Sequence, residues 1–346
     1  MSWVWDDPNF YQNFNNSYFG DFNFYISFVI SLVFNTLLIY LVSKVKTYKA
    51  PVRLSMYLMA LLRILFSASI ALTCPSIIYS RNATHLYIMK NGVNFPNGIG
   101  HVFLALFVSF MVMACSGPAI QYIQVANFLS FHPTKEIRRH LSILPIFVAL
   151  TSLALIFFGY IPPFYKIRIS SLVREILEEE GDTPYLIITV RLTYDSTRNS
   201  NTFQLFSQIC TFFILVTMFG SIFIVIYCTV YIQKQMKIRF IASSTSKKSQ
   251  EQLNKALLLQ NPLLIQFILP FITIHIPFYI VVILPFFGVA WRNFADRIFF
   301  LFCWCPAINP ILVIILVKKI RTELFTCKNG KGSQAPSRSI AIVVSM

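Results

Sequence analysis

The chain has 346 residues, of which 56% are hydrophobic and only 12% charged, and its formal net charge is +16. The charged fraction is about half that of an ordinary soluble domain, which excludes a typical soluble globular fold and indicates a lipid environment. In such a protein, the basic excess indicates Lys and Arg beside the inner ends of membrane spans, so nucleic acid is not an expected partner.

Seven apolar segments follow a polar N-terminal segment, residues 1–21. Each reaches the roughly 20 residues that a helix needs to cross about 30 Å of hydrocarbon. The predicted spans are 22–42, 54–78, 101–128, 141–161, 203–230, 256–287 and 296–317, and a tail, 318–346, follows them. The sequence therefore predicts an all-α membrane protein, a seven-transmembrane helix bundle in the lipid bilayer.

The distribution of basic residues predicts the orientation of the bundle. With the N-terminus outside, 19 of the 29 Lys and Arg residues lie in cytoplasmic segments. Nine lie outside, and five of those are in one long loop, 162–202, where charge has less influence on topology. We therefore expect an extracellular N-terminus and a cytoplasmic C-terminus. The sequons at Asn15 and Asn82 then face the lumen and are candidate glycosylation sites.

A charge lies inside the second span. Arg63 is nine residues into it, about 14 Å along a helix that rises 1.5 Å per residue. A charge at that depth is costly and usually faces the bundle interior. Its predicted partners are Asn35, Gln121, Gln124 or backbone carbonyls in a polar network, and the alternative is that it snorkels toward the cytoplasmic surface. Gln121 and Gln124 are three residues apart and share one face of the third helix.

Basic residues concentrate in the predicted cytoplasmic loops. The segment 231–255 is interpreted in two compatible ways, as a solvated loop near anionic lipid and as a docking surface for a cytoplasmic protein. The sixth span that follows contains Pro262, Pro270, Pro277 and Pro285. Proline kinks are either static packing features or hinges for a two-state motion. The basic residues expected to face a cytoplasmic partner are Arg138, Arg139, Lys234, Lys237, Arg239, Lys247 and Lys248.

The start of the tail combines apolar and basic residues at helical spacing. This pattern predicts a short amphipathic helix on the inner leaflet, and Cys327 at its end is a candidate for palmitoylation. The chain has no Gly-rich phosphate loop and no His-Glu-x-x-His motif, and Cys303 and Cys305 are too close for a usual zinc spacing. We therefore expect no cofactor, no metal site and no enzyme activity.

Three motifs resemble nematode serpentine chemoreceptors of the Str superfamily. The seventh span ends in Pro306-Ala307-Ile308-Asn309-Pro310, which resembles the Pro-x-x-(Asn/Asp)-Pro end of their last helix. The run from Gln252 through Ala256-Leu257 to Pro262 is similar to the entry to their sixth helix, and Asn35 to Tyr40 resembles their first helix. Unlike rhodopsin-like receptors, the third helix ends in Ala126-Asn127-Phe128 without an acidic-Arg-Tyr motif, and the loop 162–202 has no Cys for the usual disulfide.

The resemblance implies a chemosensory G-protein-coupled receptor at the plasma membrane, in a sensory-neuron cilium, with a heterotrimeric G protein as partner. An odorant or pheromone-like small molecule is expected to bind among the outer halves of the helices. The expected lining residues are Phe107, Phe110, Phe212, Phe278, Tyr279 and Trp304, and Asn309 joins the expected polar network. The alternatives are a seven-helix ligand-gated channel, which would have its N-terminus inside, and a transporter, which usually shows internal repeats.

Overall fold

A computed structural model describes most of the helical core. The described residues are 18–45, 50–79, 84–89, 93, 99–129, 150, 185–189, 198–242, 267–283 and 292–328. The fourth predicted span, 141–161, lies outside them except for Leu150, as do Asn15, Asn82, Arg138, Arg139, Lys247 and Lys248. The side chains of Gln124, Lys237, Arg239 and Cys327 are also outside the described part.

The described elements are mainly long helices. In chain order they are α2 (Tyr18–Lys44), α3 (Ala50–Thr73), β1 (Pro75–Tyr79), β2 (Thr84–Met89), α4 (Ile99–Leu129), β3 (Tyr185–Thr189), α7 (Arg198–Ala242), a π-helical turn (Phe271–His275), α9 (Ile276–Ile283), α10 (Arg292–Leu316) and α11 (Lys318–Lys328). In this part of the chain, five helices are long and apolar enough to cross a membrane, and a shorter apolar helix covers Phe267–Ile280.

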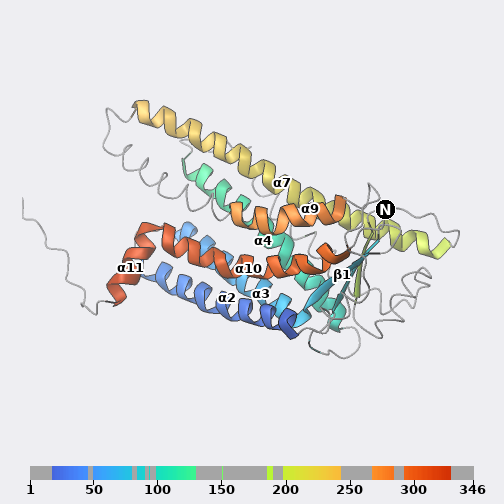
Figure 1. The fold of residues 1–346 in the computed structure, drawn as a ribbon. Coiled ribbons are helices and arrows are strands. Elements are labelled where there is room, and N and C mark those ends of the chain that lie inside the picture. Colours follow the sequence, from blue (N-terminus) through green and yellow to red (C-terminus); the bar gives the residue numbers. More distant parts are fainter. Residues whose placement is uncertain are drawn as a thin grey trace, which may run out of the picture.

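The long helices lie roughly alongside one another, with a small sheet at one end and α11 at the other (Figure 1). We call the sheet end the outer end, because it is extracellular in the predicted orientation. α2 packs against α3 and α10, α3 against α4, and α4 against α7. The side chains buried between these helices are mostly large and apolar. Exposed apolar residues, such as Val29 and Phe223, suit a surface that faces lipid.

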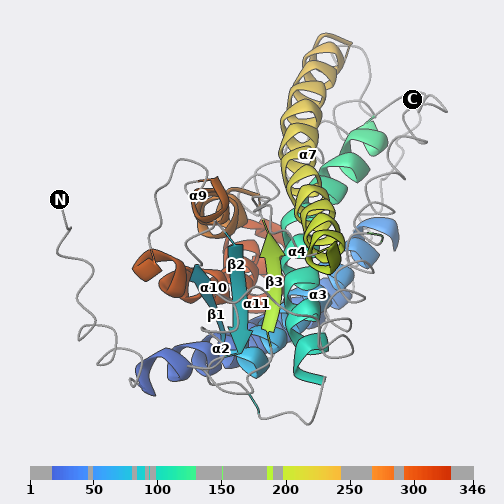
Figure 2. The same ribbon diagram turned by 90° about the vertical axis from the view of Figure 1, so that its right-hand side faces the viewer.

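The sheet was not foreseen from the sequence. β1 pairs antiparallel with β2, and β2 pairs antiparallel with β3, which comes from the long loop 162–202. The sheet contacts α4, α7 and α10 and lies across the outer end of the bundle, as Figure 2 shows. The strand sequences PSIIY, THLYIM and YLIIT are rich in the β-branched and aromatic residues that favour strands.

The second predicted span, 54–78, extends too far at its outer end. α3 ends at Thr73, and residues 75–78 belong to strand β1. Pro75 disfavours a right-handed helical conformation at the residue before it, and Cys74 indeed has a left-handed φ of 39°. Its N–H still donates to the Ile70 carbonyl at 2.8 Å, which closes the helix. Hydropathy continued through this break because the strand is as apolar as the helix.

Other helix boundaries also differ from the predicted ones, for example the start of α2 and the end of α7. α2 begins at Tyr18, within the segment that was assigned to the N-terminal region 1–21. α7 continues to Ala242, well past the predicted span 203–230. In both places polar or basic residues extend a helix beyond its apolar stretch, so hydropathy marks the membrane core and not the end of the helix.

Candidate functional site: an aromatic cluster and a polar layer

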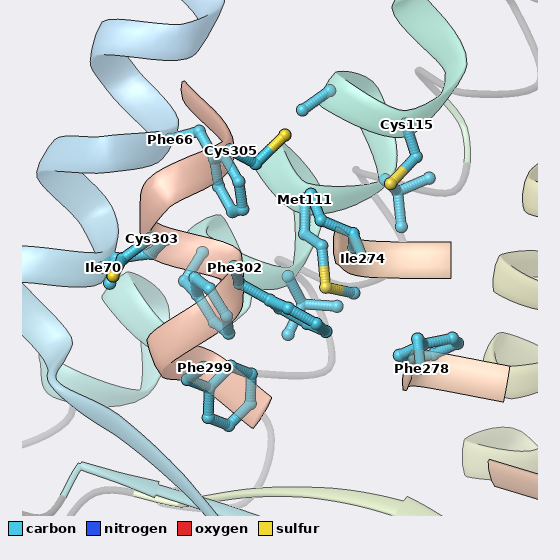
Figure 3. Close-up of a cluster of buried hydrophobic side chains, with 14 of the residues drawn as sticks. Phe66, Ile70, Met111, Cys115, Ile274, Phe278, Phe299, Phe302, Cys303 and Cys305 are labelled. Atoms are coloured by element: carbon cyan, nitrogen blue, oxygen red, sulfur yellow. The ribbon is translucent and has the colours of Figure 1, made fainter. Parts of the chain in front are cut away.

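The outer half of the bundle contains a densely packed aromatic cluster. It comprises Phe66 on α3, Phe107 on α4, Phe278 on α9, and Phe299 and Phe302 on α10, each no more than 2% exposed. Figure 3 shows four of these rings together with Ile70, Met111 and Ile274. Side chains from separate helices thus converge on one apolar region beneath the sheet.

The rings of this aromatic cluster contact one another in specific geometries. Phe66 stacks on Phe107 with centroids 6.0 Å apart. Phe107 meets the edge of Phe299 at 5.4 Å, and Phe299 meets Phe302 at 5.3 Å and nearly a right angle. Stacked and edge-to-face pairs are the arrangements that aromatic quadrupoles favour. The cluster therefore ties α3, α4 and α10 together through one chain of rings.

Five of the six predicted lining residues belong to this region. Phe107 and Phe278 are buried within it, and Phe110, Tyr279 and Trp304 pack against it. Phe212 does not join them, since its side chain is 62% exposed and points away from the cluster. It occupies the outer surface of α7 because the helical period places positions 214 and 218, not 212, on the inward face.

One hydrogen bond and one stacked ring pair border the aromatic cluster. Trp304 Nε1 donates to Asn23 Oδ1 of α2 at 2.9 Å, and Tyr279 stacks on Phe219 of α7 at 4.2 Å and 8°. Sequence reasoning missed Asn23 and Phe219. Asn23 could have been identified from the sequence, because a polar amide one residue into an apolar span needs a hydrogen-bond partner.

The π-helical turn lies beside the cluster. A π-helical hydrogen bond joins residues five apart, and here the N–H of Ile276 donates to the carbonyl of Phe271. Pro277 follows directly and has no N–H to continue the regular helical pattern. Within the turn, His275 is fully buried and its Nδ1 lies 3.2 Å from the Pro270 carbonyl, so Nδ1 carries the proton and donates. Such turns are frequent at functional sites.

Below the aromatic cluster, Asn35 links α2 to α10. Its Nδ2 donates to the Pro306 carbonyl at 3.1 Å and to the Ser31 carbonyl at 2.8 Å. The Ser31 hydroxyl lies 3.4 Å from the same Pro306 carbonyl. In a regular helix that carbonyl would accept from the residue four positions on, but that residue is Pro310, which has no N–H. The first helix therefore satisfies a carbonyl that proline leaves unpaired in the last.

Arg63 remains inside the bundle, so snorkelling is not what the structure shows. Its side chain is only 4% exposed, and Nη2 has no hydrogen-bond partner. Cys305 of α10 is in its neighbourhood. Cys305 immediately precedes Pro306, which Asn35 contacts, and Asn309 is buried one turn further along α10. We call Ser31, Asn35, Arg63, Ser67 and Asn309 the polar layer.

Gln121 is not brought to Arg63 as the sequence suggested. It is buried on α4, and its Oε1 has no partner, just as Arg63 Nη2 has none. Gln121 is one turn beyond Gly117, which faces Met59 of α3, one turn inward of Arg63, and its neighbours pack with α7. It therefore belongs to a second packing region nearer the inner end of the bundle.

Comparison with known proteins decides the family. A family model described as serpentine type 7TM GPCR chemoreceptor Str matches residues 21–325, which is most of the chain. The chain belongs to the Str family. This confirms the resemblance found in the three sequence motifs.

Two individual matches agree with the family. The Str receptor described here is 30% identical over 130 residues to serpentine receptor class r-10 of Caenorhabditis briggsae. That alignment spans 37% of this chain and 35% of the relative, so it covers only about a third of either protein. Squid rhodopsin has 17% identity and a TM-score of 0.55 over 90% of this chain and 85% of its own. The rhodopsin match confirms the seven-transmembrane fold, and the protein is a multi-pass membrane receptor of the GPCR type.

The inner end of this Str receptor carries α11. Ile320 is fully buried against α10 and α2, whereas Arg321 is exposed and its Nη1 donates to the Ile315 carbonyl at 3.1 Å. Lys234 near the inner end of α7 is also exposed. The basic segment of α7, with Lys237 and Arg239, continues as helix to Ala242.

Proposed function

We propose that this Str receptor binds a small, largely apolar molecule from the outer side and activates a heterotrimeric G protein. The observation that carries the proposal is the aromatic cluster, which gathers rings from α3, α4, α9 and α10 in the outer half of a receptor fold. Ligand sites in helical bundles are lined mainly by apolar and aromatic side chains with few polar groups. Tyr279 and Trp304 at the edge of the cluster supply those polar groups.

The position of Phe278 and Tyr279 supports a coupling of ligand binding to a conformational change of the sixth helix. Both follow the π-helical turn by a few residues, and that turn is bounded by Pro270 and Pro277. A ligand that contacts them favours whichever arrangement of the turn it binds more tightly. In the proposed active state, the inner end of the sixth helix is displaced, and the turn is where the helix bends.

The inner end of α7 supports the proposed G-protein contact. This helix extends past the apolar stretch to Ala242, and its extension carries Lys234, Lys237 and Arg239. Basic side chains on a rigid helix favour association with an acidic partner surface. We place the receptor at the plasma membrane of a sensory cilium, as for a chemoreceptor that samples the outside.

The test is a screen of volatile and water-soluble small molecules in cells that express the receptor, a promiscuous G protein and a calcium reporter. We expect a ligand-dependent signal that disappears when the G protein is removed. An N-terminal tag on intact cells checks both surface expression and the outward N-terminus. A signal that persists without the G protein would contradict the proposal and favour the ligand-gated channel.

Two matched variants locate the ligand. Phe278→Ala removes a ring in the aromatic cluster, and Phe212→Ala removes an exposed ring on α7. Losing the contact of one buried ring costs about 1.5–3 kcal/mol, so Phe278→Ala should raise the half-maximal ligand concentration about 10- to 100-fold. Phe212→Ala should leave it nearly unchanged. Equal effects of the two variants, at equal surface expression, would place the ligand elsewhere.

A further inference from the structure

The polar layer is enclosed between two apolar regions. On α3, Arg63 lies between Phe66, which belongs to the aromatic cluster, and Ala60, which belongs to an inner apolar cluster. The three positions are one turn apart, so they occupy successive levels of one helix. Among the described residues of α3, apolar side chains therefore lie on both sides of Arg63 along the helix.

The other helices show the same order. On α10, Asn309 lies between Cys305 of the aromatic cluster and Val313 of the inner cluster. On α2, Asn35 lies one turn above Leu38, which also belongs to the inner cluster. Because α2, α3 and α10 pack against one another, the polar layer is one level of the bundle and not a set of scattered residues.

This layer contains two buried donors without an acceptor. Arg63 Nη2 has no hydrogen-bond partner, and neither does the hydroxyl of Ser67, which is only 1% exposed. The two residues are four positions apart on α3, so they share a face and their Cβ atoms are neighbours. Other buried hydroxyls on this helix are satisfied locally, since Ser69 donates to the Phe66 carbonyl at 2.7 Å. Ser67 therefore faces a position that calls for an acceptor.

The predicted spans supply no counter-charge at this level. None of the seven apolar segments contains Glu, and their one Asp is Asp296, at the start of the last segment. Asp296 precedes Asn309 by 13 residues, or about 19 Å of helix. An unpaired charge buried in a membrane protein is costly and ordinarily has a partner of opposite sign. A neutral acceptor such as Asn35 Oδ1, which also lacks a partner, cannot neutralise it.

We propose that the polar layer binds a small monovalent anion, such as chloride, between Arg63 and Ser67. A guanidinium and a hydroxyl supply the charge-assisted and neutral donors that such an ion needs. We infer a small ion because Arg63 and Ser67 are only 4% and 1% exposed. The anion would stabilise the contact of α2, α3 and α10 whether or not the receptor couples to a G protein.

The experiment measures thermal unfolding of the purified full-length receptor in detergent or nanodiscs. Sodium chloride is titrated against sodium gluconate at constant ionic strength, so that only the small anion changes. An ion that binds the folded state raises the melting temperature in proportion to ln(1 + [anion]/Kd). We expect a rise with chloride and bromide that follows this binding curve and is absent with gluconate. The same melting temperature in chloride and gluconate at all concentrations would overturn the proposal.

Three variants assign the effect to the proposed site. Arg63→Gln should abolish the chloride dependence, and Ser67→Ala should raise the half-saturating chloride concentration about 3- to 10-fold, the loss expected for one hydrogen bond. Ser69→Ala is the control, because its hydroxyl already donates to Phe66. If Arg63→Gln does not fold, Ser67→Ala and Ser69→Ala still decide. A chloride dependence that is identical in both serine variants and the wild type would place the anion elsewhere.

Discussion

The hydrogen bond from Asn35 to the Pro306 carbonyl should measurably stabilise the packing of α2 against α10. Asn35→Ala removes a donor at 3.1 Å from an acceptor that has no N–H from Pro310 to replace it. Leaving a buried acceptor unpaired costs about 1–3 kcal/mol, while interhelical hydrogen bonds in membrane proteins average about 0.6 and reach about 1.7 kcal/mol. The Ser31 hydroxyl, 3.4 Å from the same carbonyl, compensates in part. We expect a loss of about 1 kcal/mol.

A double-mutant cycle with Pro310→Ala tests the reason for this loss. Alanine at 310 provides the N–H that proline lacks, so the Pro306 carbonyl gains its ordinary partner within the helix. In that background, Asn35→Ala should cost markedly less, with a coupling energy of about 1 kcal/mol.

The assay is reversible unfolding of the purified receptor with a denaturing detergent, with thermal unfolding as a check. Ser43→Ala on the same helix is the control, because it removes an exposed hydroxyl that bonds only to Tyr40, 2.6 Å away. An equal cost of Asn35→Ala in both backgrounds would refute the reasoning, because the unpaired carbonyl would then not be the cause.

Three further substitutions probe packing and a polar contact. Gly117 faces the end of the Met59 side chain, where a Cβ would clash, whereas nothing lies within 4 Å of a Cβ at Gly220. We expect Gly117→Leu to destabilise the receptor by about 1–3 kcal/mol and Gly220→Leu to be neutral or slightly stabilising, and equal melting temperatures would contradict this. Asn23→Leu should cost about 0.5–1.5 kcal/mol by leaving Trp304 Nε1 without its acceptor. The same measurement checks it, and an unchanged melting temperature would show that the bond adds nothing.

Hydropathy and charge were enough to predict the bundle, because crossing a bilayer imposes length and composition on each helix. They did not predict the sheet, since the apolar run continues from α3 through Pro75 into β1 without a polar break. They also did not separate Phe212 from Phe278, because Phe occurs on lipid-facing and inward surfaces alike and only packing distinguishes them.

The polar layer was predictable only in part. Asn35 and Arg63 stand out as polar residues in apolar spans, and both are buried in the structure. Their partners were less evident, since Asn35 contacts a backbone carbonyl. The available signal was the four-residue spacing of Pro306 and Pro310, which leaves one carbonyl unpaired. Ser67 could also have been predicted, because it lies one helical turn from Arg63 and therefore on the same face.

We propose above that this Str receptor signals through a G protein. The most direct test of this proposal is guanine-nucleotide exchange by a purified heterotrimeric G protein, with the receptor reconstituted in nanodiscs and a ligand identified in the cell screen. The account predicts ligand-dependent exchange that is lost at low ligand concentration in Phe278→Ala and retained in Phe212→Ala. No exchange, together with ligand-driven ion flux through the same receptor in protein-free liposomes, would contradict it.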